Sequence, residues 1–142
     1  MKIKVLLVDD EKEFIEALAE RLAVRDFYVK TAFNGDEALS KIKEDDFDVV
    51  VLDVLMPGKN GIETLREIKS IKPLVNVIML TGHATVETAI DGMKAGAYDY
   101  LMKPTDTNDL VGKIKKAYNI KADHEKRIRN AEINKIIEKR GW

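Results

Sequence analysis

The chain has no cysteine, few prolines and no apolar run long enough to span a membrane. Without cysteine, neither a disulfide framework nor a thiolate metal site can form, so nothing requires an oxidising compartment. The sequence also contains no internal repeat and no low-complexity segment. The apolar start at residues 3–8 is too short for an export signal and ends at acidic residues. We therefore expect a cytosolic protein that makes no membrane contact.

The bulk composition is that of a folded globular domain. Of 142 residues, 45% are hydrophobic and 35% are charged, which is enough apolar surface for one domain with a substantial core. The net charge is −1, but residues 121–142 hold seven Lys/Arg and four Asp/Glu. We interpret this basic tail as a solvated helix and expect no direct binding of nucleic acid.

Hydrophobic periodicity predicts ten elements. Five segments have the continuous or alternating apolar pattern of strands, at residues 3–8, 28–32, 47–52, 77–80 and 97–101. Five apolar stripes at helical spacing lie between and after them, and we interpret all five as core-facing: Phe14/Ala17/Leu18/Leu22, Ala38/Leu39/Ile42, Ile62/Leu65/Ile68, Val86/Ala89/Ile90/Met93 and Leu110/Val111/Ile114/Ala117/Tyr118. The alternation predicts an α/β fold, a three-layer, doubly wound domain with a five-stranded parallel sheet. We expect the domain to end near residue 121 and residues 122–142 to form a charged, helical C-terminal tail.

Polar side chains follow four of the predicted strands. Asp9 and Asp10 follow the first strand, and Asp53 follows the third. Thr81 ends the fourth strand, and Lys103 comes shortly after the fifth. A single aspartate at a strand end is usually a turn or cap residue. The joint arrangement is more specific, because the carboxyl ends of parallel strands share one edge, where open α/β sheets bind ligands.

Three neighbouring carboxylates need a cation. Two charges about 5 Å apart at an effective dielectric of about 20 repel by roughly 3 kcal/mol. All-oxygen ligands favour a hard ion such as Mg²⁺, whereas His83 and His124 have no partner at metal-ligand spacing. An aspartate beside Mg²⁺ and a lysine is suited to attack phosphorus and form an acyl phosphate. The pattern therefore indicates phosphoryl chemistry at Asp53.

Four segments together resemble the receiver domain of two-component response regulators: VLLVDDE, VVVLDVLMPGKNG, VIMLTGHAT and GAYDYLMKP. The resemblance runs from residue 3 to about residue 120 and is closest to receivers of ATPase-type transcription activators. It implies the flavodoxin-like strand order 2-1-3-4-5. It also implies that Asp53 is the phosphoacceptor, charged from a phosphohistidine on a sensor histidine kinase. Asp9, Asp10 and the backbone carbonyl of Leu55 would hold Mg²⁺ together with Asp53.

The resemblance further implies a conformational switch rather than an enzyme. Thr81 and Lys103 would contact the phosphoryl group, and Tyr100 would be the aromatic residue that changes rotamer. Alternation along the strand places Tyr98 on the same strand face, so Tyr98 could be mistaken for it. The bond between Lys103 and Pro104 would be the family's cis peptide. The switch would act on an output partner that the sequence does not name, and receivers of this type often form homodimers.

The alternatives to this interpretation differ in specific residues. A haloacid-dehalogenase-type aspartyl phosphatase needs a second aspartate where Leu55 stands, and the chain is short for that family. A nucleotide-binding domain needs a glycine-rich turn after the first strand, where this chain has acids. A receiver that works without phosphorylation would lack an acid or the lysine.

The sequence leaves open whether the chain is a stand-alone regulator or the N-terminal receiver of a longer transcription activator. No ATPase domain follows, and 22 residues are too few for a helix-turn-helix unit. The ending in Gly-Trp after a charged segment favours a stand-alone regulator.

Overall fold

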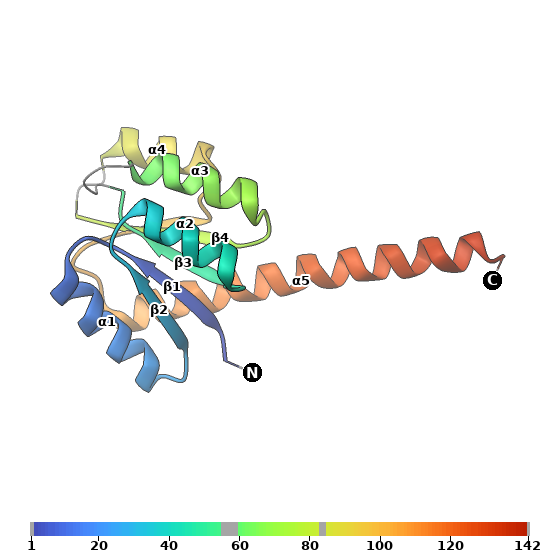
Figure 1. Ribbon diagram of the computed structural model, residues 1–142, viewed down its shortest axis with the longest axis horizontal. Coiled ribbons are helices and arrows are strands. Elements are labelled where there is room, and N and C mark those ends of the chain that lie inside the picture. Colours follow the sequence, from blue (N-terminus) through green and yellow to red (C-terminus); the bar gives the residue numbers. More distant parts are fainter. Residues whose placement is uncertain (1, 55–59, 83–84, 142) are drawn as a thin grey trace.

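The structure is a computed structural model that describes residues 2–54, 60–82 and 85–141. A five-stranded parallel sheet forms its middle layer, in the order β2-β1-β3-β4-β5 (Figure 1). The strands are β1 (Lys4–Val8), β2 (Tyr28–Ala32), β3 (Val49–Leu52), β4 (Asn76–Thr81) and β5 (Asp99–Met102). The five predicted strands are thus confirmed to within two residues at each end, as is the strand order that the family resemblance implies.

Helices cover both faces of the sheet. They are α1 (Lys12–Val24), α2 (Gly35–Glu44), α3 (Gly61–Ile71), α4 (Val86–Lys94) and α5 (Thr107–Lys139). Apolar residues of α1 and α5 pack with one face of β1, β3 and β4, and those of α2 and α3 pack with the other face. This is the three-layer arrangement that the alternating pattern predicted.

Strand sequence follows strand position. The central strands β1, β3 and β4 are buried on both faces, which explains their unbroken Val, Leu and Ile runs. The edge strands β2 and β5 alternate between more and less exposed residues. Most helices begin at a side chain that accepts a hydrogen bond from a backbone N–H in the first turn; these N-caps are Asn34, Asn60, Thr85 and Asp106.

The prediction that all five helical stripes face the core is wrong for α4. Val86, Ile90 and Met93 are 79%, 48% and 46% exposed. The helix turns Gly92 towards the sheet instead, and a Cβ there would lie 2.3 Å from the sulfur of Met79. Periodicity of apolar side chains misses this contact because glycine has no side chain. A smaller error concerns α1, where Ile15 is buried with Leu18 and Leu22 while Ala17 is exposed.

The last helix continues beyond the domain without a break. The last buried residue of α5 is Ala117, whose carbonyl accepts a 2.8 Å hydrogen bond from Asn76. One turn later, Lys121 Nζ lies 3.3 Å from Asp48 and 3.0 Å from Glu125. Residues 126–139 then project away from the sheet (Figure 1). The predicted helical tail is therefore confirmed as a continuation of α5, while the domain boundary at residue 121 stays a prediction.

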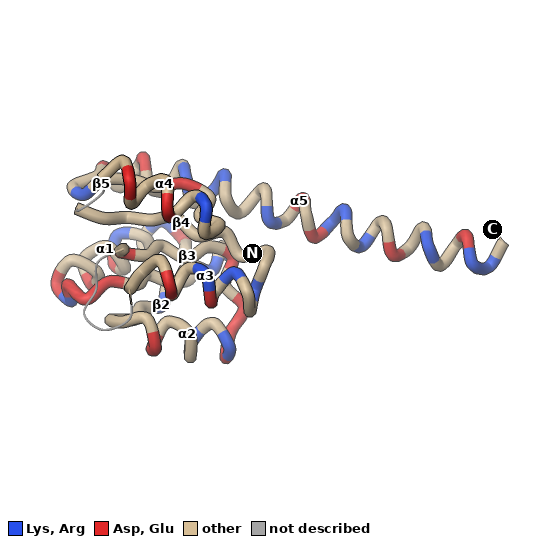
Figure 2. Tube along the Cα trace, turned by 90° about the horizontal axis from the view of Figure 1, so that it is seen from above, with Lys and Arg blue, Asp and Glu red and all other residues tan. Residues whose placement is uncertain are grey.

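Charged residues line the projecting part of α5 on all sides. Lys/Arg and Asp/Glu are interspersed along it (Figure 2). Isoleucines are exposed between them, with Ile133 and Ile136 each 52% exposed. Even this longest helix of the described residues lacks the apolar stretch that a membrane crossing requires.

We expect a chain that ends at Arg127 to unfold with a free energy within about 1 kcal/mol of the full chain, because residues beyond Arg127 bury almost no surface. It keeps the contacts of Lys121 with Asp48 and Glu125. Urea denaturation followed by circular dichroism measures the difference. A loss above about 2 kcal/mol would show that the projecting helix stabilises the domain.

Candidate functional site

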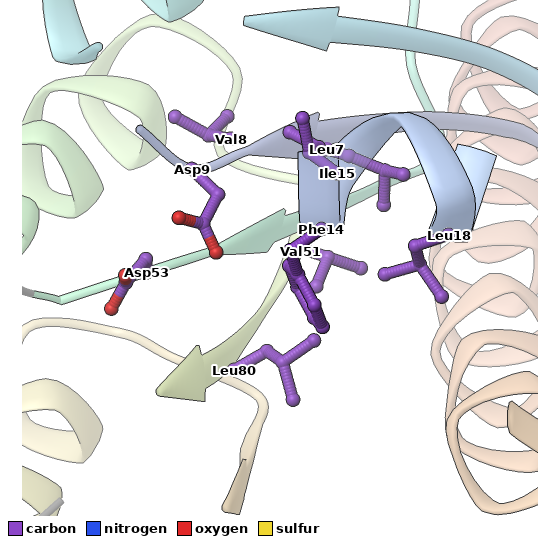
Figure 3. Close-up of a pocket in the computed structure, with 9 residues that line it drawn as sticks. All are labelled: Leu7, Val8, Asp9, Phe14, Ile15, Leu18, Val51, Asp53 and Leu80. Atoms are coloured by element: carbon purple, nitrogen blue, oxygen red, sulfur yellow. The ribbon is translucent and has the colours of Figure 1, made fainter. Parts of the chain in front are cut away.

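The predicted acids meet at the carboxyl edge of the sheet. Val8 at the end of β1 is paired with Leu52 at the end of β3, so the next residues, Asp9 and Asp53, lie side by side. Both are 4% exposed. Figure 3 shows their carboxylates at the same edge of the sheet. Asp10 is exposed, and ligand atoms of Asp9, Asp10 and Asp53 all lie within 4.8 Å of one another.

Lys103, which directly follows the edge strand β5, brings a positive charge into this group. Its Nζ lies 2.6 Å from Asp9 Oδ2 and 3.5 Å from Asp53 Oδ2. It also lies 3.3 Å from Glu11 Oε1. The side chain of Lys103 is only 12% exposed, so its charge is poorly screened by water. The following bond, to Pro104, is cis, as the resemblance implied.

The electrostatics of the site follow from burial and pairing. Burial raises the pKa of Asp9 above its ordinary value, outweighing hydrogen bonds from Lys103 and from the Glu11 backbone N–H that lower it. Burial alone would lower the pKa of Lys103, but the hydrogen bond to Asp9 and the charge of Asp53 outweigh it and raise that pKa. The lysine is therefore a firm cation at neutral pH. It faces the carboxylates of Asp9, Asp53 and Glu11, with Asp10 close by, so negative charge remains in excess.

Thr81 and Tyr100 border one hollow beside this cluster. Thr81 is buried at the end of β4, and its carbonyl accepts a 2.9 Å hydrogen bond from the Lys103 backbone N–H. Tyr100 lies on edge strand β5 and is 42% exposed. The hollow between them is also lined by Val54 and Ala89. The prediction that Tyr98 shares a strand face with Tyr100 is wrong, because Tyr98 packs against the core on the face of α1 and α5, whereas Tyr100 lies with Val54 and Met79 on the other face.

Leu55, whose carbonyl the resemblance assigns to Mg²⁺, lies outside the described residues. The described part of the site also contains residues to which sequence analysis gave no role. Glu11 belongs to the acidic run after β1, but its contact with Lys103 joins positions 92 residues apart. Phe14 was assigned only to a core stripe, yet its ring centroid lies 4.4 Å from Lys103 Nζ. Only the fold brings these pairs together.

Comparison with known proteins identifies the family of the chain. The family model for the response regulator receiver domain covers residues 5–115. The chain belongs to the response regulator receiver family. The crystal structure of a CheY-like response regulator receiver domain protein from Methanospirillum hungatei matches with a TM-score of 0.84 and 29% identity, over 87% of this chain and 99% of that one.

Longer proteins contain similar receivers. The transcriptional regulatory protein ZraR of Salmonella typhimurium is 40% identical over 116 residues, which are 82% of this chain and 26% of ZraR. A CpxR homolog of Haemophilus influenzae is 42% identical over 130 residues, 92% of this chain and 56% of that protein. The chain thus spans about a quarter to a half of the length of these relatives.

Gly61 lies against the backbone of the segment that follows β3 and contains Asp53 and Val54. A Cβ at Gly61, the first residue of α3, would lie 2.5 Å from the Asp53 carbonyl oxygen and 2.6 Å from Val54 Cα. The Gly61 N–H also donates a 2.9 Å hydrogen bond to the Val54 carbonyl. Because all these atoms belong to backbone, a side chain at this position would force the segment after β3 to shift.

We therefore expect Gly61→Ala to lower the free energy of unfolding by about 1 to 3 kcal/mol, as overpacking typically does. Gly112→Ala is the matched control, because a Cβ at Gly112 in α5 meets nothing within 4 Å. That change should raise the free energy of unfolding by up to about 1 kcal/mol through helix propensity. Urea denaturation measures both, and equal effects of the two substitutions would contradict the backbone contact.

Proposed function

We propose that Asp53 accepts a phosphoryl group from the phosphohistidine of a sensor histidine kinase and that the modified receiver switches conformation. The observation that carries this proposal is the placement of Asp53. Its carboxylate is buried at the end of β3, close to the carboxylates of Asp9 and Asp10 and 3.5 Å from the Lys103 ammonium. A carboxylate held rigidly beside a cation and further acids suits nucleophilic attack on phosphorus.

The transfer is a substitution at phosphorus. An Asp53 Oδ atom forms a bond to phosphorus while the phosphorus–nitrogen bond of the phosphohistidine breaks, and neutral imidazole leaves with a proton from solvent. With acetyl phosphate as donor, the phosphorus–oxygen bond breaks and acetate leaves. The chain contributes mainly position and charge, as is usual in phosphoryl transfer.

Asp9, Asp10 and Asp53 would hold Mg²⁺, with the Leu55 carbonyl as an expected fourth protein ligand. The donors fit, because they are all oxygens and the three carboxylates approach one another closely. The negative charge of the three carboxylates exceeds the single positive charge of Lys103, so the remaining charge would attract a divalent cation. When bound, Mg²⁺ would neutralise phosphoryl oxygens during the transfer.

Lys103 has a second role in this proposal. Both oxygens of Asp9 are already engaged, Oδ1 by the Glu11 N–H and Oδ2 by Lys103. If a cation were held at Asp9, Lys103 would lose part of its attraction to Oδ2, and its ammonium could then move towards Asp53. There it would pair with a phosphoryl oxygen as a compact point charge.

The switch would use the hollow between Thr81 and Tyr100. The hydroxyl of Thr81 can donate to a phosphoryl oxygen on Asp53. Movement of Thr81 towards Asp53 enlarges the hollow that Tyr100 borders, and an inward turn of the Tyr100 ring fills it. The exposed ring also lies against α4, beside Ile90 and Met93, so its rotation changes that surface.

The relatives of the chain indicate what the switch would control. Relatives named transcriptional regulatory proteins carry this receiver in a longer chain, which supports control of transcription through a further domain or a partner. A receiver of that kind is a phosphoacceptor rather than a catalyst for other substrates. It would act in the cytoplasm, with homodimer formation as one means of reading the switch.

The deciding experiment is phosphorylation by labelled acetyl phosphate with Mg²⁺ present. We expect label on the intact protein and none on Asp53→Asn, because an amide cannot form the acyl phosphate. Asp123→Asn, a change at an exposed aspartate of α5 that lies far from the site, is the control and should label normally. Label that persists in Asp53→Asn would remove Asp53 from the role.

Removal of Asp10 tests the metal ligands separately. Asp10 makes none of the contacts with Lys103 that the structure gives to Asp9, Glu11 and Asp53. We expect Asp10→Asn to weaken Mg²⁺ binding roughly tenfold or more, equal to about 1.4 kcal/mol. Mg²⁺ titrations followed by calorimetry and by thermal unfolding measure this change, and stability without Mg²⁺ should stay level or rise slightly as repulsion falls. An unchanged titration would show that Asp10 is not a ligand.

A further inference from the structure

The Lys103 ammonium has an aromatic neighbour as well as acidic ones. Its Nζ lies 4.4 Å from the centroid of the Phe14 ring, well within the range of a cation–π contact. The same nitrogen has three N–H donors, and the carboxylates of Asp9, Glu11 and Asp53 all lie within 3.5 Å of it. The ring therefore occupies a side of the ammonium that water would otherwise hydrate.

Phe14 lies at the boundary between the core and the acidic cluster. It comes from the first turns of α1 and is partly buried against the apolar residues on that face of the sheet. Its ring lies beside Val51 and Leu80, to one side of the Asp9 and Asp53 carboxylates (Figure 3). The same side chain thus borders the core on one side and Lys103 on the other.

We propose that Phe14 is a positioning residue for phosphoryl transfer, which keeps the Lys103 ammonium dehydrated and close to Asp53. This inference rests on the proposed function of Asp53. A lysine side chain is long and flexible, and the ring narrows the space in which its end can move. Because water is excluded from that side, the charge of Lys103 acts more strongly on a phosphoryl group.

The chemistry of the ring also suits a lysine that has to move. A carboxylate holds an ammonium at a fixed hydrogen-bonding position, whereas the face of an aromatic ring attracts a cation over a broad area. Lys103 can therefore shift from Asp9 Oδ2 towards Asp53 while it stays over Phe14. A fourth carboxylate in place of the ring would hold the ammonium back, and an aliphatic side chain would confine it without attracting it.

The test compares initial rates of label uptake from acetyl phosphate with Mg²⁺ in the full chain. We expect Phe14→Leu to lower the rate by about 3- to 30-fold, the range of a partly dehydrated cation–π contact. Phe14→Tyr keeps the ring and should restore the rate to within about twofold. If Phe14→Leu does not fold, Phe14→Met replaces it, because a flexible methionine fills irregular apolar space.

A second phenylalanine provides the matched control. Phe33 is also partly buried against the same core face, and its ring centroid lies 5.1 Å from Lys12 Nζ. Phe33→Leu removes the same volume and a similar contact, but not one with Lys103, so the uptake rate should stay within about twofold of the unchanged protein. The inference would be overturned if Phe14→Leu took up label as fast as the unchanged protein. It would also be overturned if Phe33→Leu slowed uptake as much as Phe14→Leu does.

Thermal unfolding separates positioning from simple packing. The loss of melting temperature caused by Phe14→Leu should be smaller when Lys103 is already replaced by Met, because the cation–π partner is then absent. Equal losses in both backgrounds would show that Phe14 only fills space. Failure of the proposed function is a distinct result, since then the unchanged protein would take up no label at Asp53.

Discussion

The ammonium of Lys103 among the acids at the carboxyl edge of the sheet is the interaction on which the site depends. Burying Asp9 and Asp53 is unfavourable unless a cation lies beside them, and Lys103 is the cation that contacts both. Lys103 follows β5, which pairs with β4, and β4 pairs with β3. This pairing brings the end of β5 close enough for the lysine to reach the carboxylates. The site therefore depends on this strand order. A different order would leave buried carboxylates without a counter-charge.

Of the five helices, α4 has the fewest buried residues, and it lies in the same region as the site. Gly92 is the only buried residue of α4, and the apolar side chains of Val86, Ile90 and Met93 are exposed. A helix with so little buried surface can shift at a small free-energy difference. Tyr100 connects this helix with Thr81, because its ring borders hollows that each of them lines. The weak packing of α4 thus suits a surface that changes when the Tyr100 ring turns inward.

The projecting end of α5 has a different origin from the body of the domain. Helices in water need packing against other elements to be stable, and residues 126–139 have none within the described chain. Their helical form is supported by continuity with the buried part of α5 and by contacts at its root, where Lys121 joins Asp48 and Glu125. These contacts set the direction in which α5 leaves the sheet.

The sequence alone determined the order and type of the elements, because unbroken apolar runs suit the central strands and helical periodicity marks α1, α2, α3 and α5. It also determined that Asp9, Asp10, Asp53, Thr81 and Lys103 share one edge, because parallel strands end together. Periodicity failed for α4, where the contact with the sheet is made by Gly92, a residue without a side chain. Only the tertiary structure decided that Glu11 and Phe14 face Lys103, since nothing local relates α1 to a residue about 90 positions later in the chain.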